Sequence, residues 1–302
     1  MARVLAAADI GSNTVHLLVA ETDGTKVRRL ENRSEWIALG ETVARLGHIP
    51  GGHADNLVQI LREFRQVAAA YRAADFYVFA TEAVRAAENH DQVLERIRKE
   101  TKLTVDVISP RTEAEYSLRG SRLDCQVGPD LTFFEVGGGS AQIASVEDDS
   151  IASEYSLRLG TGRIVAESGL TNPCPPEALE AARKYIRETL KSLPSLPRRP
   201  AAVASGGVIR GVWRAVHPDG EPRLALEELR YVSWSAARLT AERAAARFNC
   251  KIKRAATFVP GALVYEELLM AAGFEEVRVS EYGVREGAVL SMAQGKVKAW
   301  LA

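Results

Sequence analysis

Cysteine is scarce in this chain, and neither sign of charge is in excess. The three cysteines, Cys125, Cys174 and Cys250, are scattered and form no C-x-x-C pair, so neither a zinc site nor a disulfide framework is indicated. Such cysteine usage fits the reducing cytoplasm, which we predict as the location. The 39 lysines and arginines equal the 39 aspartates and glutamates. This balance argues weakly against a general nucleic-acid-binding protein but leaves room for a local basic groove for a polyanion.

Long uncharged apolar runs are missing as well. No stretch approaches the length needed to span a bilayer, and Asp9 interrupts the short apolar run near the N-terminus, unlike a signal peptide. We therefore expect no membrane partner. The chain has 302 residues, 46 % of them hydrophobic and 26 % charged, which is typical of a globular protein and comfortable for two domains.

The most informative stretch is the glycine-rich segment in the middle of the chain. An apolar strand from Leu131 reaches Glu135 and is followed by Gly137-Gly138-Gly139-Ser140 and a second strand through Gln142. Glycines permit positive φ and close approach of another group, and successive N–H groups in such a turn form a nest for a phosphate oxygen. An ordinary glycine hairpin remains the alternative for one such turn alone.

The same order of residues occurs near the N-terminus. There an apolar strand ends at Asp9, Gly11-Ser12-Asn13 follows, and a second strand begins at Thr14. A repeated acid-plus-glycine hairpin predicts two similar half-molecules with a ligand between them. This layout resembles the actin and sugar-kinase (ribonuclease H-like) superfamily of two-domain phosphate-handling proteins.

The remaining pattern alternates strands and helices, so the predicted fold class is α/β. We expect an N-terminal domain over 1–128 and a C-terminal domain over 129–302, whose last helix, about 285–302, could pack back on the first domain. Residues 225–247 are predicted to be helical and are rich in alanine. A third strand–glycine–helix junction is expected at Ser205, Gly206 and Gly207.

Two charged residues in the first half stand at the starts of predicted helices. Arg85 would lie one turn into the helix after Thr81, where a guanidinium is well shaped for phosphate, although a solvated surface arginine is the simpler interpretation. Glu113 would lie at the start of a helix beginning near Thr112. A carboxylate there is ordinarily a favourable dipole partner, but in a cleft it could accept a proton from water.

Taken together, these segments resemble the Ppx/GppA family of exopolyphosphatases and guanosine pentaphosphate phosphohydrolases, and most closely its short, two-domain exopolyphosphatases. Longer members carry a further helical domain, which we do not expect here. The matching stretches follow the family's order from end to end: DIGSNTVHLLVA at 9–20, FATEAVRAAENHDQVLERI at 79–97, EVGGGSAQI at 135–143, SLRLGTGR at 156–163, ASGG at 204–207 and VPGALVYEELL to VSEYGVREG within 259–287.

The resemblance implies Mg²⁺-dependent removal of the terminal phosphate of inorganic polyphosphate, or of the 5′ γ-phosphate of pppGpp, by a homodimer. It makes Glu113 the base that activates water, with Glu135 as a second catalytic residue. It also implies two sets of binding residues. Phosphate contacts are expected from Gly11, Ser12, Asn13, Arg85, Gly137, Gly138, Gly139, Ser140, Ser205, Gly206 and Gly207, and metal contacts from Asp9, Glu135 and Gln142.

The second loop departs from the family's usual Asp-x-Gly-Gly-Gly-Ser-Thr-Glu. Glu135 replaces the aspartate, and Gln142 replaces a carboxylate, which should weaken the attraction for Mg²⁺. A catalytically weakened sensor of polyphosphate or guanosine polyphosphates is therefore the second hypothesis. An ATP-dependent kinase of the same superfamily is the third, without a sugar-binding signature to support it.

Overall fold

The computed structural model describes residues 2–194 and 198–297, which fold into two compact units. Unit 1 joins the chain up to Leu123 to the segment that begins at Tyr282, and unit 2 is Asp124–Glu281. The sequence predicts a boundary at 128 and a last helix, about 285–302, that could pack back on the first domain. The contacts place the boundary between Leu123 and Asp124 and the helix α13 (Val284–Ala293) in unit 1, because its apolar side chains pack on that unit's sheet.

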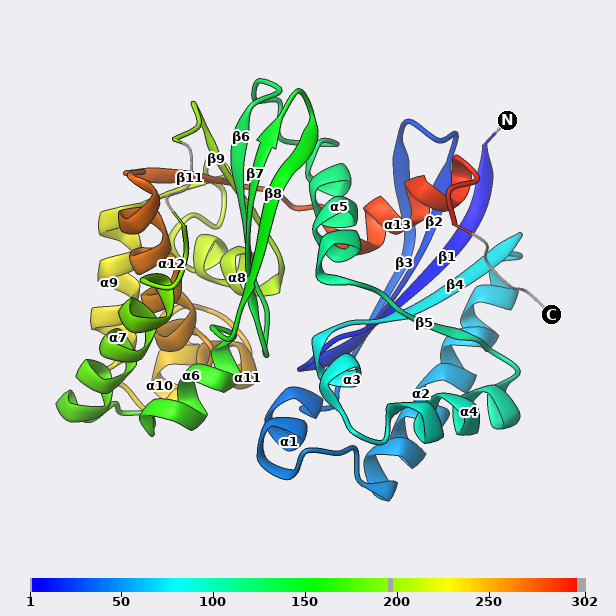
Figure 1. Cartoon of the computed structure of the whole chain (residues 1–302), viewed down its shortest axis with the longest axis horizontal. Helices are drawn as coiled ribbons and strands as arrows, with labels where there is room; N and C mark the ends of the chain where they lie inside the picture. Colours follow the sequence, from blue (N-terminus) through cyan, green and yellow to red (C-terminus); the bar gives the residue numbers. More distant parts are fainter. Residues whose placement is uncertain (1, 195–197, 298–302) are drawn as a thin grey trace. The chain divides into compact units, whose positions relative to one another are not determined.

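Unit 1 contains a five-stranded sheet in the order β3-β2-β1-β4-β5 (Figure 1). The first three strands are antiparallel neighbours, and β4 and β5 continue the sheet in parallel with β1. The elements of the unit, apart from α13, are β1 (Arg3–Ile10), β2 (Thr14–Thr22), β3 (Val27–Trp36), α1 (Leu39–Leu46), α2 (Gly51–Ala70), β4 (Asp75–Ala80), α3 (Glu82–Ala86), α4 (His90–Thr101), β5 (Val105–Val107) and α5 (Pro110–Ser121).

Strand β1 is apolar at nearly every position because helices cover both faces of the sheet. Ala6, Ala8 and Ile10 face a core built with α1, α2 and α4, whereas Leu5 and Ala7 face a second core that includes side chains of α5 and α13. Side chains alternate along a strand. Asp9 therefore lies on the same face as α5 and α13.

Unit 2 repeats this arrangement with an extra edge strand. Read from the other edge, its sheet runs β8-β7-β6-β9-β11-β10, with β6 parallel to β9 as β1 is to β4. Its elements are β6 (Leu131–Val136), β7 (Ala141–Glu147), β8 (Ser150–Leu157), α6 (Thr161–Ser168), α7 (Pro176–Leu190), β9 (Ala202–Ser205), α8 (Gly207–Val216), β10 (Arg223–Ala225), α9 (Leu226–Ala236), α10 (Ala241–Arg247), α11 (Ile252–Ala255), α12 (Phe258–Ala272) and β11 (Glu276–Val279). The predicted α/β class with two similar domains is confirmed.

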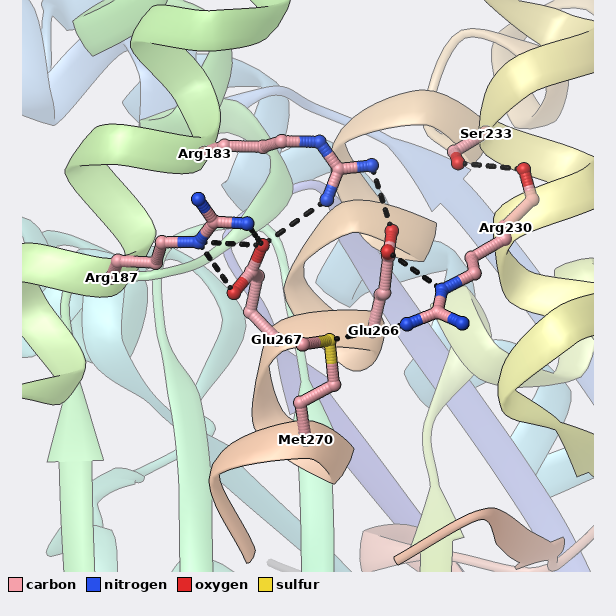
Figure 2. A network of polar contacts seen from close by, with 7 residues as sticks. All are labelled: Arg183, Arg187, Arg230, Ser233, Glu266, Glu267 and Met270. Atoms are coloured by element: carbon pink, nitrogen blue, oxygen red, sulfur yellow. Dashed lines mark hydrogen bonds and ion pairs between the residues drawn. The ribbon is translucent and has the colours of Figure 1, made fainter. Parts of the chain in front are cut away.

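Helix α12 is the central helix of unit 2, and it carries two buried carboxylates. Figure 2 shows how Glu266 and Glu267 are satisfied. Arg183 of α7 contacts both carboxylates, Arg187 of α7 holds Glu267, and Arg230 of α9 holds Glu266. Buried charges persist only when paired and hydrogen-bonded, so this network fixes α7 and α9 against α12.

The structure refines three sequence predictions about helices. The helical residues within 225–247 form two helices, because the Thr240 hydroxyl accepts the N–H of Arg243 and caps α10. The last helix ends at Ala293, and the part expected over 298–302 lies outside the described residues. The helical stretch 252–272 is long and apolar enough for a bilayer by composition, which we had not expected, but most of it is buried as in a core helix.

Candidate functional site

The β1–β2 loop of unit 1 is held from one side by backbone hydrogen bonds. The Asn13 carbonyl accepts the N–H groups of Ile37 and Ala38 at 2.9 and 3.1 Å, and the Ser12 carbonyl accepts that of Gly40 at 2.7 Å. In a trans peptide the C=O and the following N–H point in opposite directions. The N–H of Asn13 therefore points away from α1, as a phosphate-binding loop requires.

Side chains around this loop give it charge and rigidity. The Ser12 hydroxyl donates to Glu82 Oε2 at 3.1 Å, so it is held by the start of α3. Asp9 is buried, and Arg285 lies on the same side of the sheet, where its Nη1 donates to Asn32 Oδ1 at 2.6 Å and to the Leu17 carbonyl at 3.3 Å. Burial lowers the pKa of Arg285, and the nearby Asp9 and Glu286 carboxylates oppose that shift.

Arg85 and Glu113 are brought together in unit 1. Arg85 Nη2 lies 3.6 Å from Glu113 Oε2, and its Nη1 donates to the Ile108 carbonyl at 2.5 Å. Glu113 lies in the first turn of α5, which is capped by the Ser109 hydroxyl accepting the Thr112 N–H. Both side chains are mostly, but not fully, buried. The arginine therefore orients the carboxylate and keeps part of its fork for another anion.

The second glycine loop is built in the same way as the first. The carbonyls of Gly137, Gly138 and Gly139 accept the N–H groups of Thr161, Gly162 and Gly160 at 2.9, 2.8 and 3.3 Å. Peptide geometry turns the N–H groups that follow these carbonyls to the opposite side of the loop. Those groups belong to Gly138, Gly139 and Ser140, for which the sequence predicts an anion nest.

Gly160 permits this docking because the backbones touch. A Cβ added there would lie 2.3–2.4 Å from backbone atoms of Gly138 and Gly139, so any side chain would displace the loop. In both units the segment after the third strand thus supplies the N–H groups that hold the glycine loop.

Glu135, Gln142 and the Ser205 junction meet on neighbouring strands. Glu135 of β6 pairs in register with Gln142 of β7 on one side and with Ser205 of β9 on the other. Gln142 is 2 % exposed. Gly206 has φ +99°, and a Cβ there would lie 3.1 Å from Glu135 Oε1. The junction therefore needs glycine, both for its backbone angle and for the space that Glu135 occupies.

Tyr265 of α12 joins the elements of this junction and was missed by the sequence analysis. Its hydroxyl accepts the N–H of Val136 at 3.1 Å and donates to the Ser205 carbonyl at 3.3 Å, so it ties the ends of β6 and β9 together. Complete burial raises the pKa of this phenol, and the charge of Glu135 adds to the rise. A tyrosine in an otherwise apolar helix was the available signal, since a buried hydroxyl needs partners.

Arg254 of α11 adds a cation beside the Ser205–Gly207 junction. Its Nη1 donates to the Gly207 carbonyl at 3.0 Å. Burial lowers its pKa, and among the described residues no carboxylate forms an ion pair with it. An arginine so placed suits an anionic ligand.

Comparison with solved structures defines the class of protein. The fold matches that of the Aquifex aeolicus member of the Ppx/GppA protein family with a TM-score of 0.84, 21 % identity and coverage of 99 % of this chain and 100 % of that chain. It also matches an exopolyphosphatase from Cytophaga hutchinsonii with a TM-score of 0.85, 22 % identity and coverage of 98 % and 99 %. The two units therefore have the fold of these two proteins.

Sequence comparison then gives the family. Residues 18–296 match the Ppx/GppA phosphatase family, and the chain belongs to it. Exopolyphosphatase 1 of Mycobacterium bovis is 31 % identical over 297 residues, which cover 93 % of this chain and 86 % of that protein. The resemblance stated from the motifs is confirmed, and the chain is a hydrolase.

Proposed function

We propose that the protein is an exopolyphosphatase that removes the terminal phosphate of inorganic polyphosphate. The observation that carries this proposal is the shared construction of the two glycine loops, whose N–H groups at Asn13 and at Gly138, Gly139 and Ser140 are turned away from the helices that hold them. Phosphoryl transfer needs positioning and charge stabilisation more than covalent chemistry. The names of relatives, such as Exopolyphosphatase 1 of Mycobacterium bovis, support polyphosphate as the substrate.

In the proposed reaction, water attacks the terminal phosphorus while Glu113 accepts a proton from that water. The bond from this phosphorus to the oxygen of the next phosphate breaks, which releases orthophosphate and a chain shorter by one unit. Arg85 orients the Glu113 carboxylate, and the loop N–H groups stabilise charge on the phosphate oxygens. The 5′ γ-phosphate of pppGpp presents the same anhydride and is a second proposed substrate.

The residues present fit Mg²⁺ better than a metal that needs a protein cage. No group of three His, Cys, Asp or Glu side chains that could hold a metal exists within residues 2–194 and 198–297. Mg²⁺ is usually held by one or two carboxylates together with substrate phosphates and water. We propose Glu135 and the Gln142 oxygen as its protein ligands in unit 2, and Asp9 as a candidate ligand in unit 1; when bound, it would neutralise phosphate charge.

A weakened sensor is the second candidate, and Gln142 is the observation that favours it. This amide lies buried opposite Glu135, where the family resemblance predicts a carboxylate. The test is phosphate release from polyphosphate and from pppGpp with Mg²⁺, for the wild type and for Gln142→Glu. Gln126→Glu, an exposed position in unit 2, adds the same charge away from the loop.

Phosphate release by the wild type is expected and would support the exopolyphosphatase. If only Gln142→Glu releases phosphate while the wild type binds the substrate tightly, the sensor becomes the favoured function. A wild type that neither binds nor hydrolyses either compound would refute both. Sedimentation of the same samples tests the homodimer that the resemblance implies.

A further inference from the structure

Unit 2 carries a strongly basic segment in a chain whose net charge is zero. Between Leu229 and Arg254 there are seven basic residues and a single acid, Glu242. This segment covers most of α9, all of α10 and most of α11. A local excess of this size, set against a neutral whole, points to an anionic ligand at this surface.

Most of these basic residues differ from other arginines of unit 2 in that they form no ion pair among the described residues. Arg183, Arg187 and Arg230 are bound to the carboxylates of α12 (Figure 2). By contrast, no ion pair in the described part of the chain involves five basic residues of the segment, which we call the α9–α11 cation cluster. Its members are Arg238, Arg243, Arg247, Lys251 and Arg254.

Two aromatic side chains hold members of the cluster in place. The Arg238 guanidinium lies 4.2 Å from the ring centroid of Trp234 and donates to the Trp234 carbonyl at 2.7 Å. Arg247 lies over Tyr231 at 5.9 Å and donates to its hydroxyl at 2.8 Å. Trp234 is 57 % and Tyr231 44 % exposed. The arginines therefore lie on the outer face of α9, and cation–π contact orders them before any ligand binds.

The cluster is continuous with the Ser205–Gly207 junction. Arg254 bonds the Gly207 carbonyl, and α11 packs on α10 through a small alanine core formed by Ala244, Ala245 and Ala255. Arg243 and Arg247 are four residues apart on α10 and share one face of that helix. Cations thus extend from the phosphate-binding junction outward across the surface of the same unit.

We propose that the α9–α11 cation cluster binds the distal part of a long inorganic polyphosphate chain. The inference rests on the proposed function and deepens it, because it assigns long chains as the preferred substrates. A single-stranded nucleic acid is the competing ligand. It is less favoured because stacking on bases needs open aromatic faces, and the guanidinium groups of Arg238 and Arg247 already cover one face of each ring.

The test compares long-chain polyphosphate with tripolyphosphate for the wild type and for Arg243→Gln/Arg247→Gln. The expected result is a KM for long chains raised by about 2- to 30-fold, the range given by two exposed charge contacts, with no change for tripolyphosphate. Arg98→Gln/Lys99→Gln on α4 removes the same charge from unit 1 and should change neither KM. Arg243→Lys/Arg247→Lys should keep the long-chain preference.

The proposal would be overturned if Arg243→Gln/Arg247→Gln raised KM equally for long chains and tripolyphosphate. It would also be overturned if the α4 variant raised the long-chain KM by the same factor. Binding of labelled polyphosphate in the absence of turnover gives an independent readout. The wild type could hydrolyse neither substrate and still bind long chains, with that binding lost in the double variant. This result would refute the proposed function and support the cation cluster as a polyphosphate-binding surface. Tighter binding of single-stranded RNA than of polyphosphate of the same charge would assign the cluster to nucleic acid.

Discussion

At the scale of single residues, the proposed chemistry depends on a few side chains whose neighbours fix their positions. Glu113 is oriented by Arg85, and Glu135 lies between Gln142 and the Ser205–Gly207 junction. Each is placed by local structure: a capped helix start for the first, and strand register for the second. Substitutions that keep shape but remove one function are therefore the most informative.

Glu113→Gln should lower kcat for phosphate release by about 10²- to 10⁴-fold, the usual contribution of a general base. The amide keeps the size of the side chain but cannot take a proton from water. Glu115→Gln on the same helix is the control, because Glu115 is exposed and pairs only with Arg111 in the described contacts. Wild-type turnover in Glu113→Gln would remove this residue from the mechanism.

Tyr265→Phe should destabilise the protein by about 1–3 kcal/mol, since it leaves a buried N–H and a buried carbonyl without their partner. Urea denaturation measures the change. Tyr185→Phe is the matched control, because its hydroxyl makes one exposed bond to the Arg158 carbonyl. We also expect slower phosphate release, because Tyr265 ties the two strands that end at the glycine segments. Equal stabilities for the two variants would argue against this role.

At the scale of elements, both glycine loops depend on the segment that follows the third strand of each unit. In unit 1 this segment is 37–40, and in unit 2 it is 160–162. The N–H groups at these helix starts are taken by loop carbonyls, so the loop and the helix satisfy each other's backbone groups. Each loop is thus held by a second element through backbone hydrogen bonds, without a ligand.

Gly160→Ala should separate α6 from the second glycine loop, because its Cβ would meet backbone at 2.3–2.4 Å. We expect phosphate release to fall by at least about tenfold and stability by about 1–3 kcal/mol, as in overpacked sites. Kinetics and thermal unfolding measure the two effects. Gly128→Ala in the same unit has open space around the new methyl group, and wild-type behaviour is expected there. Unchanged activity in Gly160→Ala would mean that the loop tolerates displacement.

At the scale of the whole molecule, the two units repeat one strand topology but carry different candidate functional residues. Unit 1 carries Asp9, Arg85 and Glu113, while unit 2 carries the glycine triplet and the cation cluster. Burial also raises the pKa of each of the three cysteines, which lie apart from one another in the sequence. It raises the pKa of Cys125 to about 12 and of Cys174 to about 11, and it raises the pKa of Cys250 as well.

Native thiols should therefore react slowly with a disulfide reagent at pH 8. A pKa of about 11 in place of 9 lowers the thiolate fraction by about 100-fold, and rates should recover in urea. We expect Cys250 to react first, because the Arg254 guanidinium opposes the rise in its pKa. Since folding raises these values, the associated stability is present below pH 9 and is lost as the pH rises toward 12. Labelling followed by mass spectrometry checks the order, and rapid native labelling of Cys174 would contradict it.

The sequence by itself determined the repeat, the α/β class and the family, because hydrophobic period and glycine turns are local properties of the chain. It also marked the carboxylates and glycines that the structure places around each loop. It further predicted that the last helix could pack back on the first domain. Only the tertiary structure decided that Tyr265 joins β6 to β9, and that the helix starts at Leu39 and Thr161 hold the loops. These contacts join residues far apart in the chain. No local sequence pattern predicts them, because they depend on how the helices and strands pack together.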